Sequence, residues 1–216
     1  KRRDSVLDHM IQIMDYLITH IDADTKCLRA MYGDWNDALD GLGLTKNPKK
    51  EYGNGVSVMA TLQLYTNLEQ MIELLTKDLV KVYERKHKQI QEGIKKFAIK
   101  EQGNRKRIVH GWGENREYYV GSFDDVDHKS RNSLTANAFY VISGMSKNNF
   151  MSKEDILDGF KNLDSKYGLK TFEPYFEKDV KGVGRIVNLP KGTAENGATY
   201  IHGALFGVMA LFMLEE

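Results

Sequence analysis

VSVMATLQLYTNLEQMIELLTKDLVKV, residues 56–82, mixes apolar and polar side chains with helical spacing. Its apolar residues recur at intervals of three and four: Val58, Met59, Leu62, Tyr65, Leu68, Met71, Ile72, Leu75, Leu79 and Val82. This spacing places them on one face of an α-helix, which is buried against other elements. We expect one helix from Val56 and, after a break near 76–78, a second from Lys77 to Lys100 whose lysines and arginines form a solvated face.

Helical patterns also occur on both sides of this stretch. They cover residues 6–21, 131–144, 152–163 and 198–214, and the third begins with a capping-box-like Ser152 to Asp155. The sequence therefore predicts an all-α fold of six or seven helices that alternate with polar loops. Loops that gather at one end of antiparallel helices form a single concave site.

Charge and composition exclude several classes of partner. The 216 residues include 31 Lys and Arg and 30 Asp and Glu, so the net charge of +1 gives no field for nucleic acid or a membrane surface. The apolar stretch 204–214 is shorter than the roughly 20 residues that span a bilayer. With a single cysteine, Cys27, and with Lys1-Arg2-Arg3 leading into a helical pattern rather than a signal peptide, we expect a cytoplasmic protein.

The loop after the first helical pattern is rich in carboxylates and reads Gly33-Asp34-Trp35-Asn36-Asp37-Ala38-Leu39-Asp40-Gly41. A carboxylic acid can protonate a glycosidic oxygen, and a flat indole can cover a pyranose ring. The loop therefore favours sugar chemistry. The alternative is that Asp34 or Asp37 only caps a helix.

Two later loops carry similar chemistry. Residues 103–129 combine tryptophan, tyrosine, amides and carboxylates, which suits either a sugar or a loop held by its own hydrogen bonds. In residues 189–197, a turn at Gly192 and Thr193 before the last helix would offer free backbone amides to an anion, with His202 nearby. Taken alone, His202 also fits a core histidine.

Together these loops resemble glycoside hydrolase family 94, the inverting β-glucoside phosphorylases formerly placed in glycosyltransferase family 36. The specific matches are Asp34-Trp35-Asn36-Asp37 and Glu195-Asn196-Gly197 with a histidine seven residues after the glutamate. Residues 53–58 and 123–144 support them in order and approximate spacing. The run from Gly192 to His202 is most similar to the β-1,2-oligoglucan (sophorose) phosphorylase branch.

The resemblance implies an (α/α)6 barrel, of which residues 1–216 would form the C-terminal half as a fragment of a longer chain. This half would pack against the missing half, and a homodimer is expected. Val56 departs from the family pattern, because relatives commonly carry an acidic residue there.

The resemblance also assigns roles to residues. Asp37 matches the general acid, Trp35 borders the sugar, and Asp34 orients the loop or contacts the sugar. Glu195 and Asn196 match the sugar pocket. His202 matches a histidine that contacts phosphate. The amides of Gly192 and Thr193, from the turn described above, are expected to complete the phosphate site with it. The expected substrates are an oligosaccharide and inorganic phosphate, with no metal and no other cofactor.

In the implied reaction, protonated Asp37 donates to the leaving oxygen while phosphate attacks from the opposite face, which yields α-glucose 1-phosphate. An inverting hydrolase would instead need a base, for which Glu195, Asp124, Asp125 or Asp127 could serve. Two further alternatives stay open, a non-catalytic carbohydrate-binding fragment and a helical interaction module.

Overall fold

The protein is described by a computed structural model over residues 4–215, so Lys1-Arg2-Arg3, used above to argue against a signal peptide, lies outside the described residues. Within that range the α-helices are α1 (Val6–Thr19), α2 (Val58–Ile72), α3 (Lys77–Gly93), α4 (Leu134–Ile142), α5 (Lys153–Lys161) and α6 (Ile201–Glu215). The all-α prediction is confirmed, including the break between α2 and α3.

Local sequence explains where several helices begin. Ser5 and Asp8 form a capping box at α1, and Ser152 and Asp155 form another at α5, as expected. The hydroxyl of Ser57 accepts the amide of Ala60 at the start of α2. These caps satisfy amides that the first turn of each helix cannot pair.

The expected extension of α3 to Lys100 is wrong. The helix ends at Gly93, continues as a π-helical turn over Ile94–Ala98, and gives way to strand β2 (Ile99–Gln102), which pairs with β3 (Arg105–Ile108). The β-branched Ile99 and Ile108 lie opposite each other in this hairpin and are both buried. Their cross-strand packing outweighs the helical spacing of the charged run.

Short strands connect the loops. Strand β4 (Gly111–Trp112) lies between β1 (Val56–Ser57) and β5 (Tyr119–Val120) in an antiparallel sheet, with Trp112 opposite Val56 and Tyr119. Strand β6 (Asn132–Ser133) pairs with β7 (Phe172–Glu173). Short 3-10 helices occur at η1 (Asp37–Gly43), η3 (Glu114–Arg116), η4 (Met145–Asn148) and η5 (Arg185–Asn188).

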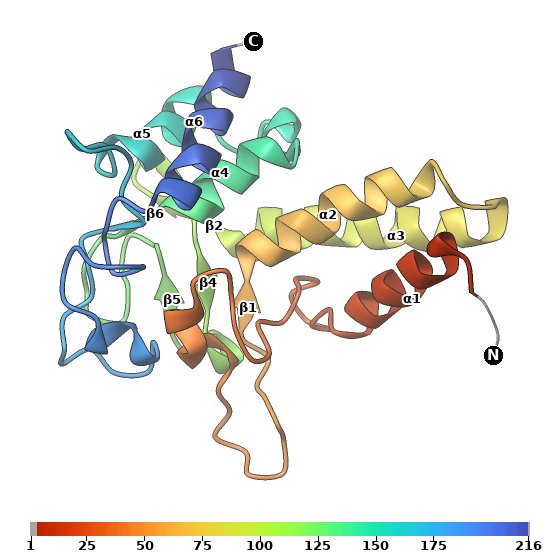
Figure 1. Cartoon of the computed structure of the whole chain (residues 1–216), viewed down its shortest axis with the longest axis horizontal. Coiled ribbons are helices and arrows are strands. Elements are labelled where there is room, and N and C mark those ends of the chain that lie inside the picture. The colour runs from red at the N-terminus through yellow and green to blue at the C-terminus, as the bar shows by residue number, and fades with distance from the viewer. Residues whose placement is uncertain (1–3, 216) are drawn as a thin grey trace.

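Figure 1 shows α2, α4 and α6 beginning near one another, beside the strands and loops, and running outward from them. Strand β1 leads directly into α2 and β6 directly into α4, and α4 packs against both α2 and α6. The main hydrophobic core lies between the helices. A smaller core lies under η1 and η5 and contains Leu39, Leu42 and Ile186, which supports the loop of the candidate acid.

Among residues 4–215, none of the helices combines the length and the apolar character needed to cross a membrane.

Candidate functional site

Side chains in the carboxylate-rich loop alternate between the interior and the surface. The Asp34 and Asn36 side chains point inward, with Asn36 completely buried, whereas Trp35 is half-buried and Asp37 is exposed. Asn36 accepts the amide of Ala38 through its side-chain oxygen and so begins η1, whose first residue is Asp37. The loop therefore presents Trp35 and Asp37 outward on a short helical turn.

Both oxygens of the Asp34 carboxylate accept hydrogen bonds from other residues of the protein. Its Oδ1 lies 2.9 Å from His110 Nε2 and accepts the amide of Asn36 at 2.9 Å, and its Oδ2 accepts the hydroxyl of Ser57. Burial raises the pKa of Asp34, but the charge of His110 and the hydrogen bonds from all three partners outweigh burial and hold the pKa below its ordinary value. Asp34 was expected to orient the loop or to contact the sugar, and its contacts fit the first role.

Asp37 and Glu195 line the same cavity, of about 390 Å³, although they come from opposite ends of the chain. Arg185, the first residue of η5, also lines the cavity. It is anchored to the turn of Asp37, because its guanidinium donates to the Asp37 carbonyl at 3.1 Å and its amide donates to the Asp40 carboxylate at 2.9 Å. A mostly exposed cation thus stands beside the two carboxylates.

Trp35, two residues before Asp37 in the chain, contacts His202. The indole lies 5.7 Å from the His202 ring and 5.8 Å from the Tyr200 ring, centroid to centroid, at the N-terminal end of α6. His202 is exposed and also contacts Phe206 at 4.7 Å. The predicted acid loop and the predicted phosphate histidine are therefore neighbours, although His202 does not line the cavity that Asp37 and Glu195 share.

The turn before α6 differs from the prediction. The amide of Gly192 donates to the Asn196 carbonyl at 2.8 Å, and that of Thr193 donates to the Pro190 carbonyl at 3.1 Å. The expectation of free amides is wrong, because carbonyls of the same turn accept both amides, and the turn ends at Asn196, five residues before α6 begins. Contact of these two residues with phosphate stays a prediction that requires the turn to open.

Asn196 is completely buried and fully engaged. Its side-chain nitrogen donates to the carbonyls of Phe176 and Leu189, and its oxygen accepts the amide of Phe176. The side chain therefore fastens the Glu195 loop to residues 174–176. This leaves the neighbouring Glu195 half-buried at the cavity while Asn196 itself faces away from solvent.

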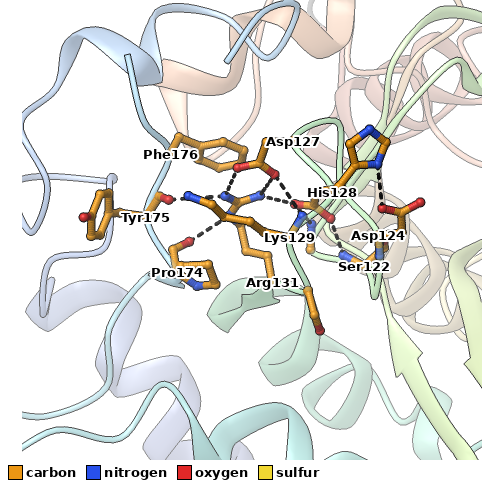
Figure 2. A network of polar contacts seen from close by, with 12 residues as sticks. Ser122, Asp124, Asp127, His128, Lys129, Arg131, Pro174, Tyr175 and Phe176 are labelled. Carbon is orange, nitrogen blue, oxygen red and sulfur yellow. Dashed lines mark hydrogen bonds and ion pairs between the residues drawn. The ribbon is translucent and has the colours of Figure 1, made fainter. Parts of the chain in front are cut away.

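Residues 174–176 are fixed in turn by a buried arginine (Figure 2). Arg131 pairs with Asp125 at 2.6 Å and with Asp127 at 2.8 Å, and it donates to the carbonyls of Pro174 at 2.7 Å and Tyr175 at 3.2 Å. Two of the three loop carboxylates considered as a hydrolytic base are thus bound in ion pairs. The third, Asp124, is exposed and pairs with His128.

Sequence reasoning missed Arg185, His110 and Arg131. None of them belongs to a motif with fixed spacing. Arg185 and His110 have their side-chain partners far away in the chain, whereas Arg131 joins two nearby carboxylates to the distant carbonyls of Pro174 and Tyr175. A charged residue in a stretch of otherwise buried positions is the signal that could have drawn attention to Arg131, which stands directly before the apolar pattern of α4.

Comparison with known proteins identifies a family for this chain. The family model described as the glycosyl hydrolase 94 superfamily, catalytic domain, matches residues 1–216. The chain is 26% identical over 215 residues to solabiose phosphorylase of Paenibacillus borealis, an alignment that covers 95% of the chain and 25% of that protein.

Two other relatives are similar at the same level. N,N'-diacetylchitobiose phosphorylase of Vibrio furnissii is 25% identical over 210 residues, which is 92% of the chain and 23% of that protein. The 3-O-beta-D-glucopyranosyl-beta-D-glucuronide phosphorylase of Paenibacillus borealis is 24% identical over 214 residues, with 95% and 25% covered. The chain thus spans about a quarter of the length of the curated relatives it matches.

The family match covers both the Asp34 to Asp37 loop and the Glu195 to His202 segment, the two parts that the fold brings together. This confirms the resemblance drawn from those loops. The chain belongs to the catalytic domain family of the glycosyl hydrolase 94 superfamily.

Proposed function

We propose that this chain is part of an inverting glycoside phosphorylase in which Asp37 is the general acid. The observation that carries the proposal is the cavity that Asp37, Glu195 and Arg185 line together, with Trp35 of the same loop in contact with His202. Phosphorylases among the relatives support the reaction class.

The residues suit a single displacement. The Asp37 carboxyl gives its proton to the glycosidic oxygen while an oxygen of phosphate attacks the anomeric carbon from the opposite face. The bond from carbon to the glycosidic oxygen breaks, the leaving sugar departs with the proton, and the product is an α-sugar 1-phosphate. Phosphate is itself the nucleophile, so the reaction needs no second carboxylate as base. Arg185, which lines the cavity, and His202, which lies beside Trp35, are the groups that we propose to hold the anion.

The substrate that we propose is a β-linked glucoside or oligoglucan, in line with the resemblance to the β-1,2-oligoglucan branch. A second cavity, of about 540 Å³, shares Leu189 with the first and is lined by Tyr175 and Lys191, which supports binding of more than two sugar units. The relatives' names contain different sugars, and fold and motif alone do not choose among them.

We also propose that the chain forms the C-terminal half of an (α/α)6 barrel in a cytoplasmic enzyme and that the enzyme is a homodimer. Large apolar side chains that are exposed on α1 and α6 support the proposal that these helices pack against further helices. Val6 is 77% exposed, Ile201 76% and Phe212 67%, and burying such side chains is worth roughly 1.5–3 kcal/mol each.

The test is phosphorolysis by the full-length enzyme of β-linked glucose disaccharides, read as glucose 1-phosphate. Asp37→Asn should lower turnover by about 10²–10⁴-fold, since the amide cannot donate the proton. Asp164→Asn, at an exposed position after α5, is the matched control and should retain wild-type rates. Wild-type rates in Asp37→Asn contradict the assignment.

Omitting phosphate separates the phosphorylase from a hydrolase. The position of Glu195 in the cavity of Asp37 favours the hydrolase as second candidate, because Glu195 could activate a water there. Sugar release that persists unchanged without phosphate would support that candidate. Loss of release without phosphate supports the phosphorylase.

A further inference from the structure

A buried polar chain links the acid loop to two helices. Asp34 and His110 have fully buried side chains, and they join through Asp34 Oδ1 and His110 Nε2 at 2.9 Å. On its other side, His110 Nδ1 lies 2.9 Å from the Ser133 hydroxyl and 3.4 Å from that of Thr135, at the start of α4. The Ser57 hydroxyl, which caps α2, donates to the Asp34 carboxylate. The loop is thereby tied to the first turns of both α2 and α4.

This chain determines which side chains of the loop face the cavity. The Asp34 carboxylate accepts the amide of Asn36, and the Asn36 side chain in turn accepts the amide of Ala38. Both inward side chains are therefore fixed by hydrogen bonds within the turn. Because Trp35 and Asp37 alternate with them, these two residues must face outward, Trp35 toward His202 and Asp37 into the cavity with Glu195.

Burial of a carboxylate and an imidazole is a costly way to hold a loop. Taking charged or polar groups out of water costs several kcal/mol unless every partner is well placed, and packed apolar side chains hold loops at lower cost. Directed hydrogen bonds, unlike apolar packing, fix the loop in a single conformation. The position of a general acid relative to the glycosidic oxygen affects the rate strongly, since a misplacement of about 1 Å can cost about 100-fold in rate.

We infer that Asp34 and His110 are positioning residues for Asp37, and that neither contacts the sugar. They hold the turn from Trp35 to Asp37 in the conformation that points the acid at the glycosidic oxygen. This inference rests on the proposed role of Asp37 and adds to it the two side chains that fix the orientation of Asp37.

The experiment uses the full-length enzyme and three variants. His110→Leu removes the donor to Asp34, and Asp34→Asn removes the carboxylate. His110→Gln keeps an amide nitrogen near the place of Nε2 and is the conservative rescue. For each we would measure kcat and KM for phosphate and for a disaccharide, with the folded fraction taken from circular dichroism.

The expected result is a kcat lowered by about 10- to 100-fold in His110→Leu and Asp34→Asn, with both KM values within about twofold of wild type. His110→Gln should recover at least about fivefold of that loss. If His110→Leu does not fold, Asp34→Asn and His110→Gln still make the comparison.

Three outcomes would overturn the inference. Unchanged kcat in Asp34→Asn means that the pair does not aim the acid. A raised KM for the disaccharide at unchanged kcat means that Asp34 contacts the sugar. A loss of activity that follows only the folded fraction means a purely structural role. Absence of phosphate-dependent turnover in the wild type would instead contradict the proposed function, so the two failures are distinguishable.

Discussion

Replacement of Arg131 by methionine should open the loops that carry the candidate site. The guanidinium is completely buried, pairs with Asp125 at 2.6 Å and Asp127 at 2.8 Å, and lies 3.8 Å from the centroid of the Phe176 ring. Methionine can fill much of the volume but leaves the Asp125 carboxylate buried without its cation. It also removes the donors to the carbonyls of Pro174 and Tyr175.

The magnitude follows from these lost contacts. Breaking a buried ion pair by removing one partner costs about 3–5 kcal/mol, because the remaining charge is uncompensated. The two carbonyl hydrogen bonds belong to the same network, so we do not add them separately. A loss of about 3–5 kcal/mol raises the local opening equilibrium by roughly two to three and a half orders of magnitude, up to the limit set by global unfolding.

Native-state hydrogen exchange of the full-length protein measures this opening. The informative amides are those of Gly121 and Ser122, which donate to Asp125, and that of Phe176, which donates to the Asn196 side chain. Lys129→Ala is the matched control, because Lys129 and Glu177 form an exposed pair at 3.9 Å that is worth about 0–1 kcal/mol.

In Arg131→Met the three amides should exchange much faster than in the control, while amides in α2 and α3 stay close to wild type. Adding Asp125→Asn and Asp127→Asn to Arg131→Met should restore part of the protection, since the uncompensated charge is then absent. Protection at Gly121, Ser122 and Phe176 equal to that of Lys129→Ala would refute the reasoning, and so would an equal increase over all helices.

Two further predictions concern the loop that carries Asp37. Gly41→Ala should destabilise the enzyme by about 1–3 kcal/mol and lower its melting temperature, because a Cβ at Gly41 would lie 2.2 Å from the Gly182 carbonyl oxygen. Gly33→Ala is the control and should change the melting temperature little, because a Cβ at Gly33 would meet no atom within 4 Å. Equal melting temperatures for the two variants would contradict this. Asp34 has a folded-state pKa below its ordinary value of 3.8, so its carboxylate stabilises the fold above that pH, and the contribution is lost as the pH falls through the folded-state pKa. The urea midpoint of wild type should therefore exceed that of Asp34→Asn at pH 5, and the gap should narrow below about pH 4; a gap that widens there would show that the sign is wrong.

The helices could be predicted from sequence, whereas the strands could not. Periods of three and four over ten or more residues, as in α2, identify a helix without any knowledge of its neighbours. Strands β1, β4 and β5 have two residues each, and Val56 finds its partner Trp112 only after the chain has folded. The error at the end of α3 has the same origin, since Ile99 pairs with Ile108 across a turn.

The candidate site could be predicted to the level of its loops but not of its contacts. The residue types of the loop at 33–41 indicate sugar chemistry, and the shared cavity of Asp37 and Glu195 agrees with it. The amides of Gly192 and Thr193 were expected to be free because a glycine and a threonine before a helix commonly leave them so. Their pairing with Asn196 and Pro190 depends on a turn whose closure the residue types do not specify.

In the proposed mechanism, Asp34 and Asp37 have different roles within a single turn although they are the same residue type. In the sequence both are aspartates close to Trp35, and only the fold shows that their surroundings differ. His110 and Ser57, from distant segments, enclose Asp34 and favour its charged form, which suits an anchor and not a proton donor. Asp37 receives no such partners from these segments and stays at the cavity with Glu195. A donor must exchange its proton with the substrate, so the proposed mechanism assigns acid catalysis to the carboxyl that is exposed at the cavity and positioning of that acid to the buried one.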